Sequence, residues 1–344
     1  MMKRRALTYS LISATACLLL VAGLMTWWNT NFLGPDTFCD GALARSDVEA
    51  ALEGKGRVTE SASPDPSSYA LRCEVARSSR FIDSPQPEFK VSFHSMRGET
   101  PFQSRVWQSR GGMSLAREGL PAGATDRRAW LLLPSSCWKK IPARSSAIPF
   151  VTTELKEGSA RPQALLRITQ LAAQRVMERA GCPETPASSE AAVDAAPAPE
   201  KKKETDPQQV CDTPGFTFPA SLLFSGRTQL DTERTTSAKD RAWLCELHLR
   251  GKNSPRITFS VSDNKNVVAA VKKQGPARTL GETTILRCSE GELYAGLWPN
   301  DPYMDVVLDD PSTSESSSMD ALRDLVTTLA TSQAEARGWH GCGS

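Results

Sequence analysis

The sequence predicts an α+β protein in which an N-terminal transmembrane helix precedes two tandem, disulfide-stapled domains. Three observations lead to this fold class. An uncharged apolar run lies near the N-terminus, and two sets of four cysteines flank a stretch rich in Pro and Ala. Each half also contains alternating apolar residues, typical of strands, followed by an amphipathic helical pattern. We therefore expect each domain to be an antiparallel sheet with a C-terminal helix packed on it.

The N-terminal segment predicts a single membrane span. Residues 1–5 contain Lys3, Arg4 and Arg5, and residues 6–28 carry no charge. As a helix, this run would extend about 34 Å, enough for a hydrocarbon core of about 30 Å. Basic residues on one side only indicate a cytoplasmic N-terminus. The residues expected to contact lipid or its headgroups are Leu11, Leu18, Leu19, Leu20, Val21, Leu24, Trp27 and Trp28.

Two alternatives to a retained membrane anchor predict the same location for the rest of the chain. A cleaved signal peptide could end near Val21-Ala22-Gly23, and a lipoprotein could be acylated at Cys17. We favour a retained anchor because the apolar run is long and continues well beyond Cys17. All three interpretations place residues 29–344 outside the cytoplasm, with the membrane as a partner and the cell envelope as the location.

The cysteine pattern indicates an internal duplication. Eight cysteines divide into four per half, and the first two of each half are 34 residues apart. Asp follows the first cysteine and Glu follows the second cysteine of each half: Asp40, Glu74, Asp212 and Glu246. Between the halves, residues 183–210 have a composition that predicts a disordered linker. The expected segments are a tail over 1–5, a membrane helix over 6–28, domains over 29–182 and 211–344, and this linker.

The same elements recur in each half. Alternating apolar residues predict one strand around the second cysteine and another after it. A helix should begin at Pro162 and end at Gly181, and its counterpart should begin at Ser317 or Ser318. A short helix with Ser46 as its N-cap and Glu49 completing a capping box is expected after Cys39.

Eight exported cysteines predict four disulfides. We expect pairing within each half, because each half then closes on itself. Each set of four allows three connectivities, of which we expect first-to-second and third-to-fourth pairing. Zinc is disfavoured, because no C-x-x-C pair occurs. The expected pairs are Cys39–Cys73, Cys137–Cys182, Cys211–Cys245 and Cys288–Cys342.

Short motifs in both halves resemble actinobacterial exported proteins of unknown function, which include cell-envelope lipoproteins and anchored proteins. They are Cys39-Asp40-Gly41-Ala42-Leu43, Leu71-Arg72-Cys73-Glu74, the Leu-Pro-Ser-Ser-Cys run ending at Cys137, and Ala180-Gly181-Cys182. The resemblance implies small, cysteine-bridged α+β domains and brings no catalytic residues. This chain lacks the good lipobox of the lipoproteins.

The sequence offers few candidates for chemistry. Ser136-Cys137-Trp138-Lys139 matches S-x-x-K and Ser262-Asp263-Asn264 matches S-D-N, but K-T-G is absent. No catalytic triad or metal motif accompanies the three histidines. The acidic run from Asp301 to Asp310 lacks a calcium-loop pattern and predicts a solvated loop. A net charge of +2 argues against a nucleic-acid partner.

We therefore expect a non-catalytic binding or interaction protein without cofactor or metal. Its partner would be an envelope protein or a wall polymer, docked at the sheet faces or between the repeats. A flexible linker would permit bivalent engagement. The alternatives are a wall-acting serine hydrolase using Ser136 and Lys139 or the acidic run, and a structural accessory subunit of a membrane complex.

Overall fold

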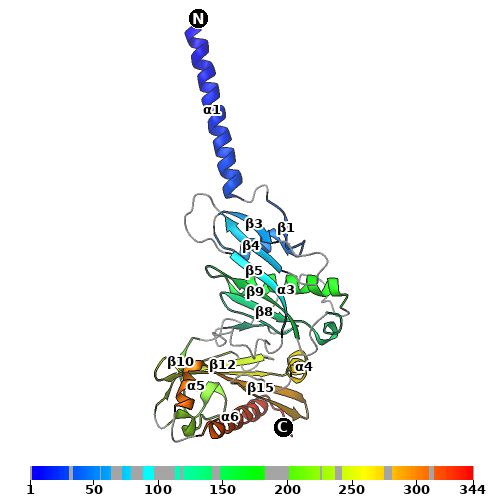
Figure 1. Ribbon diagram of the computed structural model, residues 1–344, viewed down its shortest axis with the longest axis vertical. Coiled ribbons are helices and arrows are strands. Elements are labelled where there is room, and N and C mark those ends of the chain that lie inside the picture. Colours follow the sequence, from blue (N-terminus) through cyan, green and yellow to red (C-terminus); the bar gives the residue numbers. More distant parts are fainter. Residues whose placement is uncertain are drawn as a thin grey trace.

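The chain is an α+β protein with two large antiparallel sheets and four disulfides (Figure 1). The computed structural model describes residues 2–30, 34–54, 56–62, 72–78, 88–96, 113–116, 119–141, 148–182, 201–224, 227–236, 242–274, 281–309 and 314–343. We refer to residues 34–182 as the N-terminal half and to residues 201–343 as the C-terminal half. Four bridges are typical of a protein that folds in an oxidising compartment.

The sheet of the N-terminal half has the strand order β3-β4-β5-β9-β8-β7-β6. Helix α3 (Pro162–Ala180) covers one face, and the core lies between them. Helix α2 (Arg45–Ala51) packs on α3, and a two-stranded ribbon joins β1 (Thr37–Phe38) to β2 (Leu43–Ala44). The sheet strands are β3 (Arg57–Ala62), β4 (Arg72–Ser78), β5 (Glu88–Met96), β6 (Ser114–Leu115), β7 (Ala122–Ala124), β8 (Arg128–Leu132) and β9 (Ile148–Leu155).

The sheet of the C-terminal half has the strand order β10-β11-β12-β13-β15-β14. Helices α5 (Asp301–Leu308) and α6 (Glu315–Ala336) pack against its core. The strands are β10 (Lys203–Glu204), β11 (Gln229–Thr235), β12 (Ala242–Arg250), β13 (Arg256–Ser262), β14 (Glu282–Cys288) and β15 (Gly291–Pro299).

The two sheets share the same strand connectivity. In each sheet three consecutive strands form a meander, β3-β4-β5 or β11-β12-β13. The last strand of the half, β9 or β15, pairs with the third strand of that meander, and β8 or β14 pairs with the other side of β9 or β15. These sets are β3-β4-β5-β9-β8 and β11-β12-β13-β15-β14. The strands around Cys73 and Cys245 are both second in this order and bury their cysteines completely. The duplication read from cysteine spacing therefore extends to the topology.

Helix ends follow local capping, and two predicted starts were wrong. Pro162 opens α3, and Gly181 adopts a left-handed φ of 62° after its last turn, both as predicted. Ser314, rather than Ser317 or Ser318, caps α6 by accepting a hydrogen bond from the Ser317 N–H at 3.2 Å. Helix α2 begins at Arg45, so Ser46 lies inside the first turn and forms no capping box.

Two helices arise where none was predicted. The acidic segment expected as a solvated loop contains α5, because Asn300 accepts from the Tyr303 N–H and Pro302 fits the first turn. Helix α4 (Lys265–Gln274) was not predicted, although its buried residues recur at helical spacing along one side.

The predicted linker also ends earlier than expected. Residues 183–200 lie outside the described ranges, but Lys203–Glu204 form strand β10, which pairs with β11. Val210 is buried in the core of the C-terminal half. The last ten residues of the segment 183–210 are therefore part of the fold.

Helix α1 (Met2–Asn29) projects away from both sheets (Figure 1). Its described side chains from residue 14 to residue 27 are exposed, and Leu18, Leu19 and Leu20 are 67–70% exposed. The side chains of Leu11 and Trp28 lie outside the described set. Within the described part of the chain, no helix has both the length and the apolarity that a membrane crossing requires.

A third apolar cluster joins the halves. From the N-terminal half it contains Trp130, Leu132, Ile148 and Phe150, on the sheet face opposite α3, together with Met113 and Leu115. The C-terminal half supplies Leu244, Tyr294 and the buried side of α4. Helix α4 lies at the junction of the two halves in Figure 1. The cluster packs the halves against one another, so part of each sheet face is already used inside the molecule.

Candidate functional site

A strained cysteine–aspartate turn occurs once in each half. Cys39 and Asp40 have φ values of 56° and 57°, and Cys211 and Asp212 have φ values of 61° and 53°. Left-handed conformations cost about 1–2 kcal/mol for residues with a Cβ. In each turn the cysteine is bonded to the second strand of the shared order, β4 through Cys39–Cys73 and β12 through Cys211–Cys245. The other two bridges, Cys137–Cys182 and Cys288–Cys342, complete the expected pairing.

A carboxylate supports each turn from the neighbouring strand. Glu60 Oε2 accepts a hydrogen bond from the Cys39 N–H, and Glu233 Oε2 accepts one from the Cys211 N–H, both at 2.8 Å. Sequence reasoning missed both glutamates. The shared Thr-Glu dipeptides at 59–60 and 232–233 are the signal that could have identified them.

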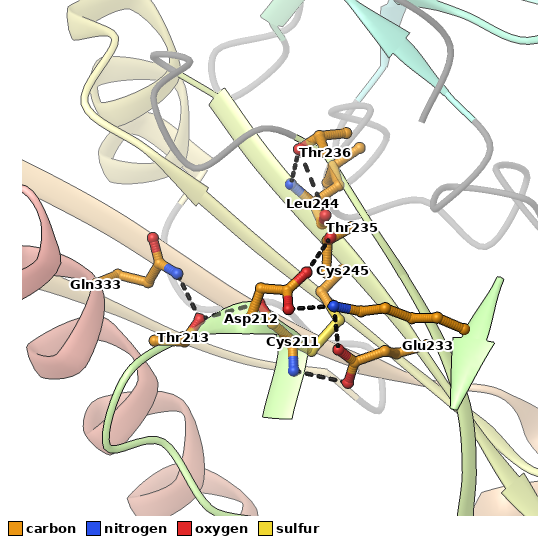
Figure 2. The surroundings of a disulfide bond; sticks show 10 residues. Cys211, Asp212, Thr213, Glu233, Thr235, Thr236, Leu244, Cys245 and Gln333 are labelled. Atoms are coloured by element: carbon orange, nitrogen blue, oxygen red, sulfur yellow. Dashed lines mark hydrogen bonds and ion pairs between the residues drawn. A yellow bond between two sulfur atoms is a disulfide. The ribbon is translucent and has the colours of Figure 1, made fainter. Parts of the chain in front are cut away.

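The turn of the C-terminal half is enclosed by further polar contacts. Figure 2 shows Asp212 facing Thr235, whose hydroxyl donates to Asp212 Oδ2 at 3.1 Å. Gln333 of α6 donates to Thr213 at 2.6 Å. Lys203 of β10 pairs with Asp212 and lies 3.6 Å from Glu233 Oε1. The edge strand, the turn and α6 are thus linked through side chains.

Glu233 is a structural rather than a catalytic carboxylate. Its side chain is only 1% exposed. Burial raises its pKa, against the opposing effects of the Cys211 N–H and Lys203. Lys203 also has a raised pKa, because its pairing with Asp212 and Glu233 outweighs its own desolvation. A carboxylate enclosed in this way is not accessible to a substrate.

The glutamates after the second cysteines face the opposite side of each sheet and form ion pairs. Glu74 lies 3.7 Å from Lys90 and 3.5 Å from Lys156. Glu246 Oε1 is 2.8 Å from His248 Nε2 and 3.8 Å from Arg256. His248 is thereby engaged in a strand-face cluster.

The fold brings the two penicillin-binding-like matches together, but without a nucleophile–base pair. The Ser135 N–H donates to Asn266 Oδ1 at 3.1 Å, so the S-x-x-K turn adjoins the helix that follows S-D-N. Ser136 Oγ is buried and has no hydrogen-bond partner among the described residues, whereas Lys139 is exposed. Cys137 between them is bonded to Cys182. Activation of serine requires an adjacent base, which this turn does not supply.

Other candidate groups are dispersed. Within the described ranges, no three His, Cys, Asp or Glu side chains gather to hold a metal ion. The side chain of His94 lies outside those ranges, and His340 lies on the exposed C-terminal segment.

An open cleft of about 740 Å³ lies beside the junction of the two halves. Gly119 lines it from the N-terminal half. The C-terminal half contributes Asp263 and Asn264, one side of α4, the β14–β15 turn and Trp339. The volume falls in the range of about 300–1,000 Å³ that is typical of small-ligand sites. Its charged and polar lining residues are Asp263, Asn264, Lys265, Asn266, Lys272, Glu290 and Glu292.

Most of the charged side chains that line this cleft have partners. Lys272 Nζ donates to both carboxylate oxygens of Glu292, at 2.5 and 2.6 Å. Asp263 pairs with Arg337 at 3.5 Å. Glu290 accepts from the His340 N–H at 3.0 Å, and this bond and one from Ser289 lower the pKa of Glu290. The lining therefore combines two ion pairs, one carboxylate that is hydrogen-bonded to the backbone, and Lys265.

Sequence reasoning named Asp263 and Asn264 only as part of a serine-enzyme match, and it did not group them with Trp339. Comparison with protein families, with curated proteins and with solved structures finds no match to this chain.

Proposed function

We propose that the chain is a non-catalytic binding protein of the cell envelope, held in the membrane by its N-terminal helix. In this proposal residues 1–5 are cytoplasmic and the two halves lie outside. The uncharged run over residues 6–28 supports the anchor, as do the exposed apolar side chains of α1. The four disulfides support the oxidising location of the halves.

The two halves act in this proposal as one binding body assembled from two duplicated domains. Shared strand order supports the two-domain origin. The third apolar cluster holds the domains in contact, which argues against independent, bivalent engagement through the linker. A partner would be recognised where the domains meet.

The observation that carries the proposal is the cleft at this junction. It combines an aromatic side chain, amides and paired charges in a concave surface of suitable volume. The Cys–Asp turns, whose cysteines are buried and whose aspartates are ion-paired, and the buried Ser136 Oγ do not offer such a surface to a partner.

Co-sedimentation of the full-length chain with wall and membrane fractions of its source cells tests this function. The chain would be purified in detergent with its disulfides intact. We expect wild-type protein to sediment with one fraction, and Trp339→Ala to reduce the bound amount at least fivefold. Lys252→Ala, in the exposed turn at the other end of β13 from Asp263, serves as control. Equal binding by wild type and Trp339→Ala would contradict recognition at the cleft, and no binding to either fraction would contradict the function.

A further inference from the structure

Building on that proposed function, we propose that the cleft beside α4 binds a neutral, hydroxyl-rich glycan chain. The proposal specifies the class of ligand. It rests on the pairing state of the lining groups, on the free amide donors and on the fixed position of one tryptophan.

Apart from Lys265, the charged groups of the lining already have protein partners. Each of the three carboxylates, Asp263, Glu290 and Glu292, has a hydrogen-bond or ion-pair partner. Lys272 is engaged by both oxygens of Glu292. A strongly charged ligand would have to displace these pairs, at a cost in desolvation and lost bonds. An uncharged ligand can accept and donate hydrogen bonds at the rim without breaking them.

Two asparagines present free amino groups at the start of α4. Asn264 Oδ1 accepts from the Asn266 N–H at 2.9 Å, and Asn266 Oδ1 accepts from the Ser135 N–H at 3.1 Å. Their oxygens are thus engaged and orient the side chains. Each Nδ2 group has no partner among the described residues and remains able to donate two hydrogen bonds. Sugar hydroxyl and ring oxygens are suitable acceptors.

Trp339 supplies a flat apolar surface in a fixed place. Gly338 turns the chain with a φ of 73°, and the Trp339 N–H donates to Ala334 O at 2.9 Å. Beyond it, His340 bonds to Glu290 and Ser289, and Cys342 is bonded to Cys288. A half-buried indole that is held from both sides loses little entropy when it packs against the C–H face of a sugar ring.

The cleft is open and continuous with solvent, as an extended polymer requires. Its volume of about 740 Å³ accommodates a short stretch of an oligosaccharide rather than a whole polymer. Lys265, at the exposed rim, is a lining cation without an ion pair within the described ranges. Replacing Lys265 therefore tests whether the cleft binds an anionic ligand.

The experiment measures binding of defined oligosaccharides to the full-length chain in detergent by titration calorimetry. The probes are neutral tetrasaccharides of glucose, N-acetylglucosamine, mannose, galactose and arabinose, together with dextran sulfate as a polyanion. We expect at least one tetrasaccharide to bind with a Kd of 1 mM or tighter, and the Kd to be unchanged between 50 mM and 500 mM salt. Trp339→Ala should weaken that binding at least tenfold, and Asn264→Ala at least threefold. Trp339→Phe should retain most of it.

Lys265→Ala and Lys252→Ala form a matched pair of exposed-lysine variants. Both should leave tetrasaccharide binding within twofold of wild type. Salt-sensitive binding of dextran sulfate alone, lost in Lys265→Ala, would overturn the neutral glycan while preserving a binding function for the cleft. Failure of all tetrasaccharides to bind would overturn the glycan proposal even where co-sedimentation with envelope fractions succeeds. Failure of both assays would refute the proposed function as well.

Discussion

Removing the Glu233 side chain should destabilise the C-terminal half by about 2 kcal/mol. The carboxylate accepts the hydrogen bond of the Cys211 N–H, within a turn where Cys211 is completely buried. A buried donor left without an acceptor costs about 1–3 kcal/mol. Loss of the Lys203 contact adds little, because Lys203 retains Asp212. Relief of the buried negative charge offsets part of the cost.

Two matched variants separate these contributions. Glu233→Gln keeps an oxygen acceptor in the same place and should cost less than about 1 kcal/mol. Glu60→Ala removes the equivalent bond in the N-terminal half. There the carboxylate is only half-buried, so water can take its place as the acceptor. We therefore expect Glu60→Ala to lower the free energy of unfolding by about 1 kcal/mol.

Urea unfolding at neutral pH without reductant provides the measurement, followed by circular dichroism. The free energy of unfolding of each variant would be compared with that of wild type. The reasoning fails if Glu233→Ala lies within 0.5 kcal/mol of wild type, which is about half of the smallest cost expected for an orphaned buried donor. It also fails if Glu233→Gln costs as much as Glu233→Ala.

Three further predictions concern pH, the junction and a disulfide. Because burial raises the folded-state pKa of Glu233, its favourable contribution is complete below the unfolded-state pKa and is lost as pH rises through the folded-state value. The unfolding free energy of wild type should therefore fall relative to Glu233→Gln between pH 4 and neutral pH, and a flat difference would contradict the raised pKa. Val268→Asp places a charge in the third apolar cluster, where Val268 is 4% exposed, and should cost several kcal/mol and increase binding of an apolar dye. Leu308→Asp, at a position that is 55% exposed, is its control and should change neither quantity; similar effects of both would argue against the cluster as an interface. Replacing both Cys288 and Cys342 by Ser opens a loop with a sequence separation of 54 residues and should cost about 4 kcal/mol on a chain-entropy estimate, measured by urea unfolding. A change below 1 kcal/mol would show that the C-terminal segment is held mainly by its hydrogen bonds to Ser289 and Glu290.

Patterns with a short period were readable from the sequence. The strands around Cys73 and Cys245 alternate because one face of each packs into the hydrophobic core of its half. The stripe of α3 recurs because one side of that helix packs on the sheet. Pairing of the cysteines within each half followed because each half then closes on itself, whereas the choice among three connectivities per half depends on how the strands and helices pack. Capping was less predictable, since Ser314, Ser317 and Ser318 are chemically equivalent candidates.

The candidate cleft could not be predicted in the same way. Its lining combines Gly119, the start of α4, the β14–β15 turn and Trp339, which are separated by up to 220 residues. No local spacing connects these groups. The S-D-N match included two of the lining residues, Asp263 and Asn264, but as part of a serine-enzyme motif.

The sequence by itself determined the α+β class, the duplication, the four disulfides and most of the buried strand and helix faces. These properties depend on local periodicity and on cysteine spacing, both of which can be read from the sequence alone. Only the tertiary structure decided that the halves share an apolar cluster through α4, that Glu60 and Glu233 support strained turns, and that a polar cleft forms beside the junction. Each of these depends on contacts between residues far apart in sequence, and such contacts are set by how whole sheets and helices pack.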